Sequence, residues 1–304
     1  MKMNFNLDGQ VAIVTGAGGG LGRSHALALA ARGAKVLVND LGDESGNAAA
    51  ADAVVNEIEK AGGEAIAHGA NVSSTEQVED MVGMAMDRWG RVDILINNAG
   101  ILRDKTFLKM SMDEFRLVVD VHLIGSANCT KAVWEIMREQ KYGRIVFTTS
   151  SSGLYGNFGQ ANYGAAKMAM VGLMNTLHLE GAKYDIRVNC LAPTAGTAMT
   201  EGLFPDAVFD LMAPGSVSPG VVFLAGPDAP SRKVLAAGGG SFAVFKGLET
   251  EGLSLAPDAV SAEGIAAAWT AIEDTEGMRE LQSGFEQPGK FAAQAARKLG
   301  IELG

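Results

Sequence analysis

Cysteines, basic side chains and long apolar runs are scarce in this sequence, and each scarcity excludes something. The only two cysteines among 304 residues, Cys129 and Cys190, stand in apolar runs without metal-ligand spacing. We interpret both as small core residues in a reducing compartment, with a disulfide between them as the lesser alternative, and we expect no metal site.

The charge balance is acidic, because 25 Lys and Arg stand against 35 Asp and Glu, which gives a net charge of −10 and a pI near 5.0. Phosphate binding relies on clustered cationic side chains, so nucleic acids and anionic membranes are disfavoured as partners. No apolar run reaches membrane-spanning length, the first residues lack a signal-peptide pattern, and the final Glu-Leu-Gly is no peroxisomal address. We therefore expect a soluble, cytoplasmic protein.

Glycine and apolar residues are abundant: there are 39 glycines, and 47% of the chain is hydrophobic, which is typical of a globular enzyme. Short Val/Ile/Leu-rich runs alternate with longer helical patterns, and they stand at 11–15, 35–39, 64–68, 92–96, 144–149, 186–191 and 233–237. Continuously apolar strands separated by helices indicate a parallel sheet covered on both faces. The sequence predicts an α/β fold, a three-layer, doubly wound parallel sheet of the Rossmann type with about seven strands.

The helical pattern from about Gln160 to Tyr184 is apolar almost all round. Such a helix must be buried on more than one side, and the chain's own sheet covers only one. We therefore expect a homodimer or homotetramer in which a second subunit covers the other side. A very thick core is the alternative interpretation.

A glycine-rich run follows the first predicted strand directly and opens a helix. Glycines in this place let the backbone approach a pyrophosphate, while the helix N-terminus offers unpaired N–H groups and the positive end of its dipole. The run lies between a strand and its helix, so a merely tight turn is the weaker interpretation. The predicted cofactor-binding residues of this run are Gly16, Gly18, Gly19, Gly20, Leu21 and Gly22.

Asp40 ends the second predicted strand, where a carboxylate can accept hydrogen bonds from the adenosine ribose hydroxyls. Its charge would repel a 2′-phosphate, and no Lys or Arg precedes Gly20 in the loop to neutralise one. The sequence therefore favours NAD over NADP as cofactor. Taken alone, Asp40 is also compatible with an ordinary solvated loop carboxylate.

Together with Asn97-Asn98-Ala99-Gly100 and Tyr163-x-x-x-Lys167, these motifs resemble the short-chain dehydrogenase/reductase family over about residues 8–240. The resemblance implies that Asn71 and Val72 lie against the adenine. It also implies that a cleft for the cofactor is lined by Asn98, Ala99 and Gly100, and that the stretch from Pro193 to Thr197 approaches the nicotinamide.

The candidate catalytic residues are Tyr163, Lys167 and Ser150. Tyr163 and Lys167 stand four apart on one helix, so their side chains share a face. A free phenol titrates near pH ~10, and we expect the ammonium and the oxidised nicotinamide to favour its ionised form, so that Tyr163 exchanges a proton with the substrate oxygen. Lys167 should also bind the nicotinamide ribose. Ser150 matches the family serine that hydrogen-bonds the substrate, although Ser151 and Ser152 are neighbouring alternatives.

Three positions depart from the common family pattern. His122 stands where an active-site Asn is usual; it can hold a water and pass a proton, or it can be a satisfied core histidine, and the sequence does not decide between the two. Asn71 replaces a common Asp, which leaves adenine contacts through the amide. Thr194 stands where Gly is usual, which affects the nicotinamide contacts of its loop.

We expect residues 1–240 to form the NAD-binding catalytic domain and residues 241–304 to form a C-terminal extension. The extension is too short for an independent domain, so it should pack on the same domain or on a neighbouring subunit. One amphipathic helix is predicted in it, with one apolar face made of Ile265, Ala268, Trp269 and Ile272.

Within the family, the chain looks most like the branch that contains the (3R)-hydroxyacyl-CoA dehydrogenase unit of peroxisomal multifunctional enzyme type 2 (17β-hydroxysteroid dehydrogenase type 4) and its bacterial relatives. The resembling stretches are 39–42, 100–104, 121–123, 153–163 and the tail, and this branch also carries His at 122. The resemblance implies NAD-dependent oxidation of a (3R)-hydroxyacyl-CoA in fatty-acid or steroid degradation. The residues predicted to form the apolar walls of an acyl-binding slot are Leu154, Tyr155, Phe158, Leu203, Phe204 and Phe209. The residues predicted to contact the anionic CoA are Arg103, Lys105 and Lys109.

Three other functions stay open. A hydroxysteroid dehydrogenase of the 17β type would use the same walls and catalytic residues. A 3-oxoacyl-carrier-protein reductase is disfavoured by Asp40, because NADPH is the usual reductant in that reaction. A non-catalytic NAD-binding sensor is disfavoured by the presence of Ser150, Tyr163 and Lys167 together.

Overall fold

The fold comes from a computed structural model that describes residues 5–43, 47–197 and 205–302. The chain divides into two compact units, Met1–Val244 and Phe245–Gly304. The first unit holds the sheet and the second holds the last two helices. The boundary lies a few residues beyond the glycines at 238–240 that mark the predicted one.

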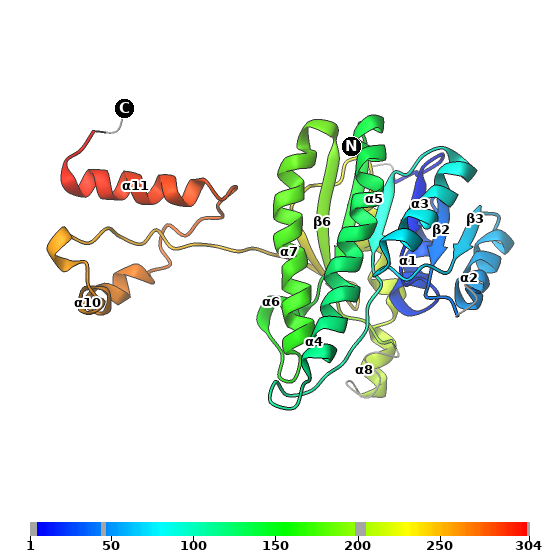
Figure 1. Cartoon of the computed structure of the whole chain (residues 1–304), viewed down its shortest axis with the longest axis horizontal. Coiled ribbons are helices and arrows are strands. Elements are labelled where there is room, and N and C mark those ends of the chain that lie inside the picture. Colours follow the sequence, from blue (N-terminus) through cyan, green and yellow to red (C-terminus); the bar gives the residue numbers. More distant parts are fainter. Residues whose placement is uncertain (1–4, 44–46, 198–204, 303–304) are drawn as a thin grey trace. The chain divides into compact units, whose positions relative to one another are not determined.

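The first unit is built on a sheet of eight strands in the order β3-β2-β1-β4-β5-β6-β7-β8 (Figure 1). Its strands are β1 Val11–Val14, β2 Lys35–Asn39, β3 Ala65–His68, β4 Ile94–Asn97, β5 Gly143–Thr148, β6 Ile186–Pro193, β7 Val234–Gly238 and β8 Ser241–Phe245. All pairings from β3 through β7 are parallel. The chain order reverses between β1 and β4, and ligands of open α/β sheets bind at such a reversal, beyond the carboxyl ends of the strands.

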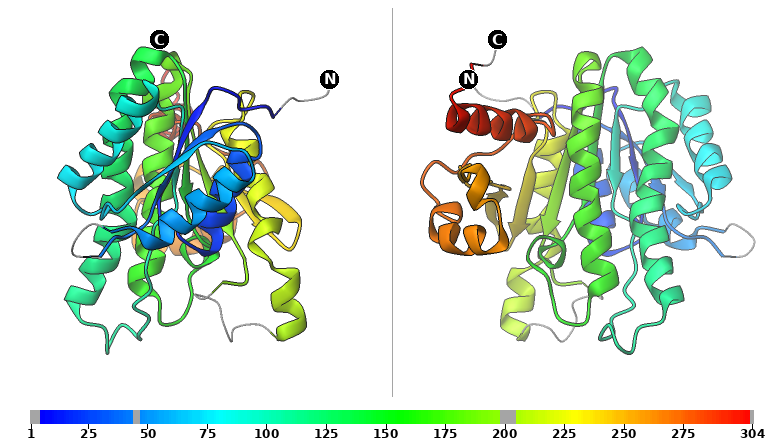
Figure 2. Two further views of the ribbon diagram at one scale, coloured as in Figure 1. Left: turned by 90° about the vertical axis from the view of Figure 1, so that its right-hand side faces the viewer. Right: turned by 60° about the vertical axis from the view of Figure 1, so that its left-hand side comes forward.

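Helices cover both faces of the sheet (Figure 2). One layer contains α1 Gly20–Ala30, α2 Ala49–Lys60 and α9 Ser218–Ala225. The other contains α3 Thr75–Trp89, α4 Met112–Val119, the π-helical turn η1 Asp120–Ile124, α5 Gly125–Gln140 and α7 Ala161–Gly181. Shorter helices are α6 Ser151–Tyr155, η2 Ala182–Tyr184, α8 Asp206–Leu211 and η3 Pro214–Ser216. The predicted three-layer α/β fold is confirmed.

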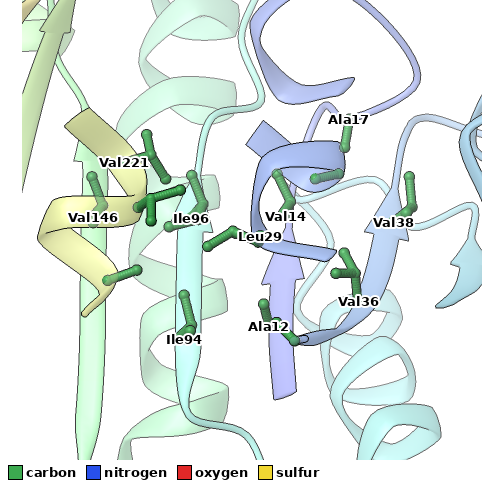
Figure 3. Close-up of a cluster of buried hydrophobic side chains, with 14 of the residues drawn as sticks. Ala12, Val14, Ala17, Leu29, Val36, Val38, Ile94, Ile96, Val146 and Val221 are labelled. Atoms are coloured by element: carbon green, nitrogen blue, oxygen red, sulfur yellow. The ribbon is translucent and has the colours of Figure 1, made fainter. Parts of the chain in front are cut away.

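Branched side chains of the central strands fill the core, as their unbroken apolar sequences require. Val14, Ile96 and Val146 are fully buried, and they meet Leu29 of α1 and Val221 of α9 (Figure 3). Cys129 and Cys190 are both buried and free, so the disulfide considered as an alternative is absent. These contacts pack α1 against β1, and the glycine loop lies between the end of β1 and the N-terminus of α1.

An eighth strand, β8, was not predicted. It follows β7 through Gly239 and Gly240, whose φ angles of 56° and 75° are those of a two-residue hairpin turn. Its side chains are mostly exposed, including Phe242 and Val244. The glycines that we took as the end of the domain therefore turn the chain back along the sheet edge.

The stretch Val208–Ala225 has a mean hydropathy of 1.5 over 18 residues, enough by composition to cross a membrane, contrary to the prediction that no run reaches this length. It is not one continuous helix. It contains the end of α8, the turn η3 and then α9, with Pro214 and Pro219 inside it. Val221, Val222 and Leu224 of α9 are buried in the core, which accounts for the apolar composition.

The apolar helix predicted from about Gln160 to Tyr184 is α7, and it ends in the turn η2. Ala166, Met170 and Met174 are buried toward the sheet, whereas Met168 and Leu179 are exposed in the single chain. These two apolar side chains of α7 are therefore not covered by the described part of the first unit. Whether a second subunit supplies that cover stays a prediction.

The second unit contains the turn η4 Pro257–Ala259 and two helices, α10 Ala262–Ile272 and α11 Glu286–Leu299. The predicted amphipathic helix is α10, while α11 was not predicted. Lys290 of α11 is buried and donates to Glu249 Oε1 at 2.5 Å and to the Thr250 carbonyl at 2.9 Å. This contact holds α11 against residues 249–250 of the same unit.

Candidate active site

The glycine run lies at the carboxyl end of β1, where the sequence placed it. Gly19 is the N-cap of α1, with extended backbone; no side chain of the described residues caps this helix, and no acidic residue stands in its first turn. The helix N-terminus therefore offers backbone N–H groups and a positive dipole end without a competing carboxylate in that turn. Such an end suits a pyrophosphate.

Gly22 is required by close backbone packing. A Cβ at this position would lie 2.1 Å from the Gly16 carbonyl oxygen and 2.6 Å from Asn98 Nδ2. Around Gly19, by contrast, a Cβ would meet nothing within 4 Å. The loop is therefore packed on its inner side and open at Gly19.

We expect Gly22→Ala to lower the free energy of unfolding by about 1–3 kcal/mol, because the methyl group must push backbone atoms apart. Gly19→Ala is the matched control, and its stability should stay within about 1 kcal/mol of the parent. Denaturant unfolding of both variants measures the difference. Equal stability of the two variants would contradict this packing.

The turn after β4 is bonded to the glycine run. Asn98 Nδ2 donates to the carbonyl oxygens of Thr15 and Gly16, each at 3.0 Å. Thr15 Oγ1 accepts from the backbone N–H groups of Asn98 at 3.0 Å and Ala99 at 3.1 Å. The structure thus brings together two predicted cofactor segments, and the connecting residue Thr15 was missed by the sequence analysis.

Asp40 lies against the same run at the end of β2. Its Oδ2 accepts from the Gly18 backbone N–H at 2.6 Å, and its Oδ1 accepts from the Leu41 N–H at 2.8 Å. A Cβ at Gly18 would lie 2.7 Å from Asp40 Oδ2, so glycine is needed for this approach. The carboxylate is therefore fixed on the loop, which makes a freely solvated loop carboxylate the weaker interpretation.

The remaining predicted cofactor residues lie after the carboxyl ends of other strands. Val72 is buried against Gly125, and Asn71 Oδ1 accepts from the Ser73 N–H at 3.0 Å. Pro193 ends β6, and the side chain of Thr197 would lie 3.6 Å from a Cβ at Gly20. The end of the 193–197 segment therefore lies beside Gly20, the first residue of α1.

The candidate catalytic side chains meet at the start of α7. Lys167 Nζ lies 5.4 Å from the centroid of the Tyr163 ring and donates to the Thr148 carbonyl at 2.6 Å. Ser150 is the N-cap of α6, where its hydroxyl accepts from the Ser152 N–H at 3.2 Å, and it lies close enough to Tyr163 to lower the pKa of the phenol. Thr149 Oγ1 donates to the Lys167 carbonyl at 2.6 Å, which ties α7 to the end of β5.

The electrostatics of the free chain differ from the expectation. Burial raises the pKa of Tyr163, the hydrogen bond from Ser150 opposes this, and the Asp104 carboxylate raises it further. Burial lowers the pKa of Lys167 to about 7. An amine with this pKa is only partly charged at neutral pH, so the chain alone does not acidify Tyr163 in the way the spacing suggested.

His122 lies in the π-helical turn η1, with its ring edge-on to Tyr163 at 5.2 Å between centroids. Its Nε2 lies 2.8 Å from the Ile101 carbonyl oxygen and 3.1 Å from the Ile101 backbone nitrogen, so Nε2 donates to the carbonyl in one tautomer and accepts from the N–H in the other. Nδ1 is buried without a hydrogen-bond partner among the described residues. Burial lowers the pKa of His122 to about 3, which keeps the ring neutral. In the tautomer that carries its proton on Nε2, the neutral ring beside Tyr163 can accept a hydrogen bond from a water at Nδ1.

The predicted substrate residues form the rim of the site only in part. Tyr155 and Phe158 are strongly exposed, and Phe209 packs on Gly196. Leu154 is half-buried, and Leu203 and Phe204 lie outside the described residues. Arg103, Lys105 and Lys109 are all exposed, but Lys105 Nζ is paired with Glu114 at 2.5 Å. Of the three cations, Lys105 is thus already neutralised.

A doubly wound sheet with a glycine loop at its reversal, together with a Ser-Tyr-Lys cluster at the start of α7, defines the class: a dinucleotide-dependent oxidoreductase. The model of the short chain dehydrogenase family matches residues 10–207. The chain belongs to this family, and it is an oxidoreductase that acts on CH–OH groups.

Similar proteins place it more closely. It is 46% identical to the peroxisomal hydratase-dehydrogenase-epimerase of Saccharomyces cerevisiae over 90% of this chain and 31% of that protein. Full-length peroxisomal multifunctional enzyme type 2 from Drosophila melanogaster has a similar structure, with a TM-score of 0.81 and 38% identity over 96% of this chain and 50% of the other. A 7α-hydroxysteroid dehydrogenase solved with NADH and a 7-oxo bile acid has a TM-score of 0.71 and 30% identity over 78% and 96% of the two chains.

The chain thus spans about a third of the yeast relative's length. The predicted resemblance to the dehydrogenase unit of such multifunctional enzymes is confirmed. The activities of the other parts of those proteins do not transfer with it.

Proposed function

We propose that this protein oxidises a (3R)-3-hydroxyacyl-CoA to the 3-oxoacyl-CoA with NAD as the electron acceptor. The observation that carries the proposal is the cluster of Ser150, Tyr163 and Lys167 at the carboxyl end of β5, beside the glycine loop that Asp40 caps. The branch-specific residues around Tyr163, together with the 46% identity to a multifunctional relative, favour a thioester substrate.

The chain's own residues supply the proton transfer. Tyr163 accepts the proton of the substrate 3-hydroxyl as the C3–H bond breaks, and Ser150 donates a hydrogen bond to the same oxygen. Bound oxidised nicotinamide supplies the hydride acceptor and a positive charge that lowers the pKa of the phenol. Lys167, with Nζ held on the Thr148 carbonyl, adds its charge and contacts the nicotinamide ribose. The balance is one hydride and one proton removed per 3-oxo thioester formed.

The residues present suit NAD better than NADP. The Asp40 carboxylate stands 2.6 Å from the Gly18 nitrogen, beside the helix N-terminus that suits the pyrophosphate, which is where ribose hydroxyls meet an acidic residue in such folds. A 2′-phosphate in that place would face the carboxylate.

We expect Asp40→Ala to lower kcat/KM for NAD by about 10- to 100-fold, because a charge-assisted hydrogen bond to the ribose is lost, and to raise the preference for NADP. Asp87→Ala, which removes the same charge from an exposed position on α3, is the control. Initial rates with both cofactors measure the ratio. An unchanged NAD-to-NADP ratio in Asp40→Ala would contradict the role given to this carboxylate.

The proposed function is tested by NADH formation with (3R)- and (3S)-hydroxyacyl-CoA of matched chain length and a 17β-hydroxysteroid. Rapid turnover of the (3R) thioester alone supports the proposal. Turnover of the steroid with silent thioesters would move the protein to the hydroxysteroid function, which the fold similarity to the 7α-hydroxysteroid dehydrogenase favours as second candidate.

Assembly belongs to the same proposal. Met168 and Leu179 are apolar side chains of α7 that are exposed in the single chain. Their burial by a second copy of the chain would give a homodimer or homotetramer. We propose that this assembly works in the cytoplasm. Sedimentation at several protein concentrations measures the assembly.

A further inference from the structure

Two segments beside the catalytic cluster run side by side. The backbone N–H of Lys105 donates to the Gly159 carbonyl at 2.9 Å, and a β-bridge joins Lys105 and Gln160. Gln160 Nε2 donates to Asp104 Oδ2 at 2.6 Å. The segment 101–105, which follows β4, is therefore fastened to the segment 159–162, which leads into α7.

Asn162 makes the buried bond of this junction. Its side chain is fully buried, and Nδ2 donates to the Arg103 carbonyl at 3.0 Å. Its Oδ1 accepts from the backbone N–H of Tyr163 at 2.7 Å. Both ends of one amide are thus used, one on the 101–105 segment and the other on the main chain of Tyr163.

The second bond matters because of where Tyr163 stands. It is the third residue of α7, where backbone N–H groups have no intrahelical acceptor, and the N-cap residue Gln160 makes no side-chain capping bond. Asn162 therefore supplies the acceptor that the N-cap side chain leaves out. The backbone N–H of Tyr163 is therefore bonded by a side chain of the same helical turn, that of Asn162.

The first bond reaches Tyr163 by another route. Ile101 begins the 101–105 segment, and its carbonyl oxygen and backbone nitrogen lie 2.8 and 3.1 Å from Nε2 of His122, whose ring lies edge-on to the Tyr163 ring. Gly100 is needed for this seat, since a Cβ there would lie 2.2 Å from His122 Cε1. The contacts form a closed circuit: Asn162 to the segment, the segment to His122, and His122 to Tyr163.

From this circuit we infer that Asn162 is a positioning residue for the oxidoreductase reaction, which orients Tyr163 through its backbone and through the 101–105 segment. The inference rests on the proposed function for its turnover readout. It predicts a loss in kcat without a loss in cofactor binding, because the glycine loop and Asp40 contact neither end of the Asn162 amide.

The test is Asn162→Ala in the full chain. We expect kcat with the accepted substrate to fall by about 10- to 100-fold, the effect of a small misplacement of a reacting group, while the Kd for NAD changes by less than about threefold. Amide hydrogen exchange within 101–105 should become at least about tenfold faster, because the segment loses its buried anchor.

Two further variants sharpen the test. Asn175→Ala removes the same side chain further along α7, where it binds Arg232, and should leave kcat and the exchange of 101–105 unchanged. Asn162→Asp keeps the shape and the acceptor for the Tyr163 N–H but loses the Nδ2 donor to Arg103, so it should also lower kcat and loosen 101–105. It decides the question if the alanine variant does not fold.

The outcomes separate the two proposals. Parent-like kcat in folded Asn162→Ala, unchanged exchange in 101–105, or an equal loss of NAD binding would overturn the positioning role. Failure of the parent protein to turn over any thioester or steroid would overturn the proposed function, and hydrogen exchange of the Asn162 variants would still decide whether the amide anchors the segment.

Discussion

Replacing Tyr163 by Phe is expected to lower kcat by about 10²- to 10⁴-fold, the usual contribution of a positioned general acid–base group. The substitution removes only the phenolic hydroxyl, and it leaves the ring packed against His122. The glycine loop and Asp40 are untouched, so the Kd for NAD should stay within about threefold of the parent. NADH formation under saturating substrate, and a fluorescence titration with NAD, measure the two quantities.

Tyr184→Phe is the matched control. Tyr184 lies in η2, where its hydroxyl accepts from Arg138 Nη2 at 3.2 Å, away from the catalytic cluster. It should keep parent-like turnover. Residual activity of Tyr163→Phe within about tenfold of the parent would assign the proton transfer to another group. A cofactor sensor would instead keep its function in this variant, because NAD binding survives.

The sequence predicted most of the fold because the central strands are rich in Val, Ile and Leu without a strict polar alternation. Runs such as 11–15 and 144–149 match β1 and β5 closely, since strands covered on both faces are marked by clusters of large apolar side chains. Strand β8 escaped this pattern, because it lies at the sheet edge with exposed side chains and therefore carries no burial signal. Its turn, Gly239-Gly240, resembles a linker when only composition is considered.

The candidate site was predictable where spacing alone defines chemistry. Tyr163 and Lys167 share a helix face, and the glycine run follows a strand directly, so both groups could be located from their order. Thr15, Thr149 and Asn162 could not, because their roles consist of hydrogen bonds to backbone atoms of distant segments. Short polar side chains carry no periodicity, and only the fold shows which carbonyl or N–H group they meet.

Proton affinities were the least predictable feature. Four-residue spacing puts the Lys167 amine near the Tyr163 phenol, but it says nothing about how much water reaches them. Complete burial of the Lys167 side chain decides its pKa, and burial also dominates that of Tyr163. A desolvation effect depends on all surrounding elements, which a local pattern does not contain.

Lys167→Met should therefore stabilise the NAD-free protein while abolishing most turnover. In the parent, Lys167 is charged below its folded pKa of about 7, although its side chain is buried, and the unfolded chain holds the proton up to about pH 10.5. Below pH 7 the fold bears the full cost of burying the ammonium, up to about 5 kcal/mol from such a difference in pKa. Methionine has a similar length and no charge, so it removes this cost.

The gain should depend on pH in one direction. Loss of the Nζ bond leaves the Thr148 carbonyl without that donor, at a cost of about 1–3 kcal/mol, so a net gain in unfolding free energy of about 2–4 kcal/mol is expected below pH 7. As the pH rises from 7 to about 10.5, folded Lys167 loses its proton first, the cost in the parent vanishes, and the gain turns into a loss of about 1–3 kcal/mol, which is the cost of the unpaired Thr148 carbonyl. Urea unfolding of the NAD-free proteins at several pH values measures this curve.

Lys131→Met, at an exposed position on α5, controls for the loss of a positive charge and should show no such curve. A Lys167→Met protein that is less stable at every pH, or whose gain in stability does not change with pH, would contradict the prediction. It would show that burial of the Lys167 ammonium does not destabilise the folded parent. We expect Lys167→Met to be more stable than the parent and to have a kcat lowered by at least about 10²-fold. This combination would mean that the buried amine serves catalysis through its charge beside Tyr163 and does not stabilise the fold.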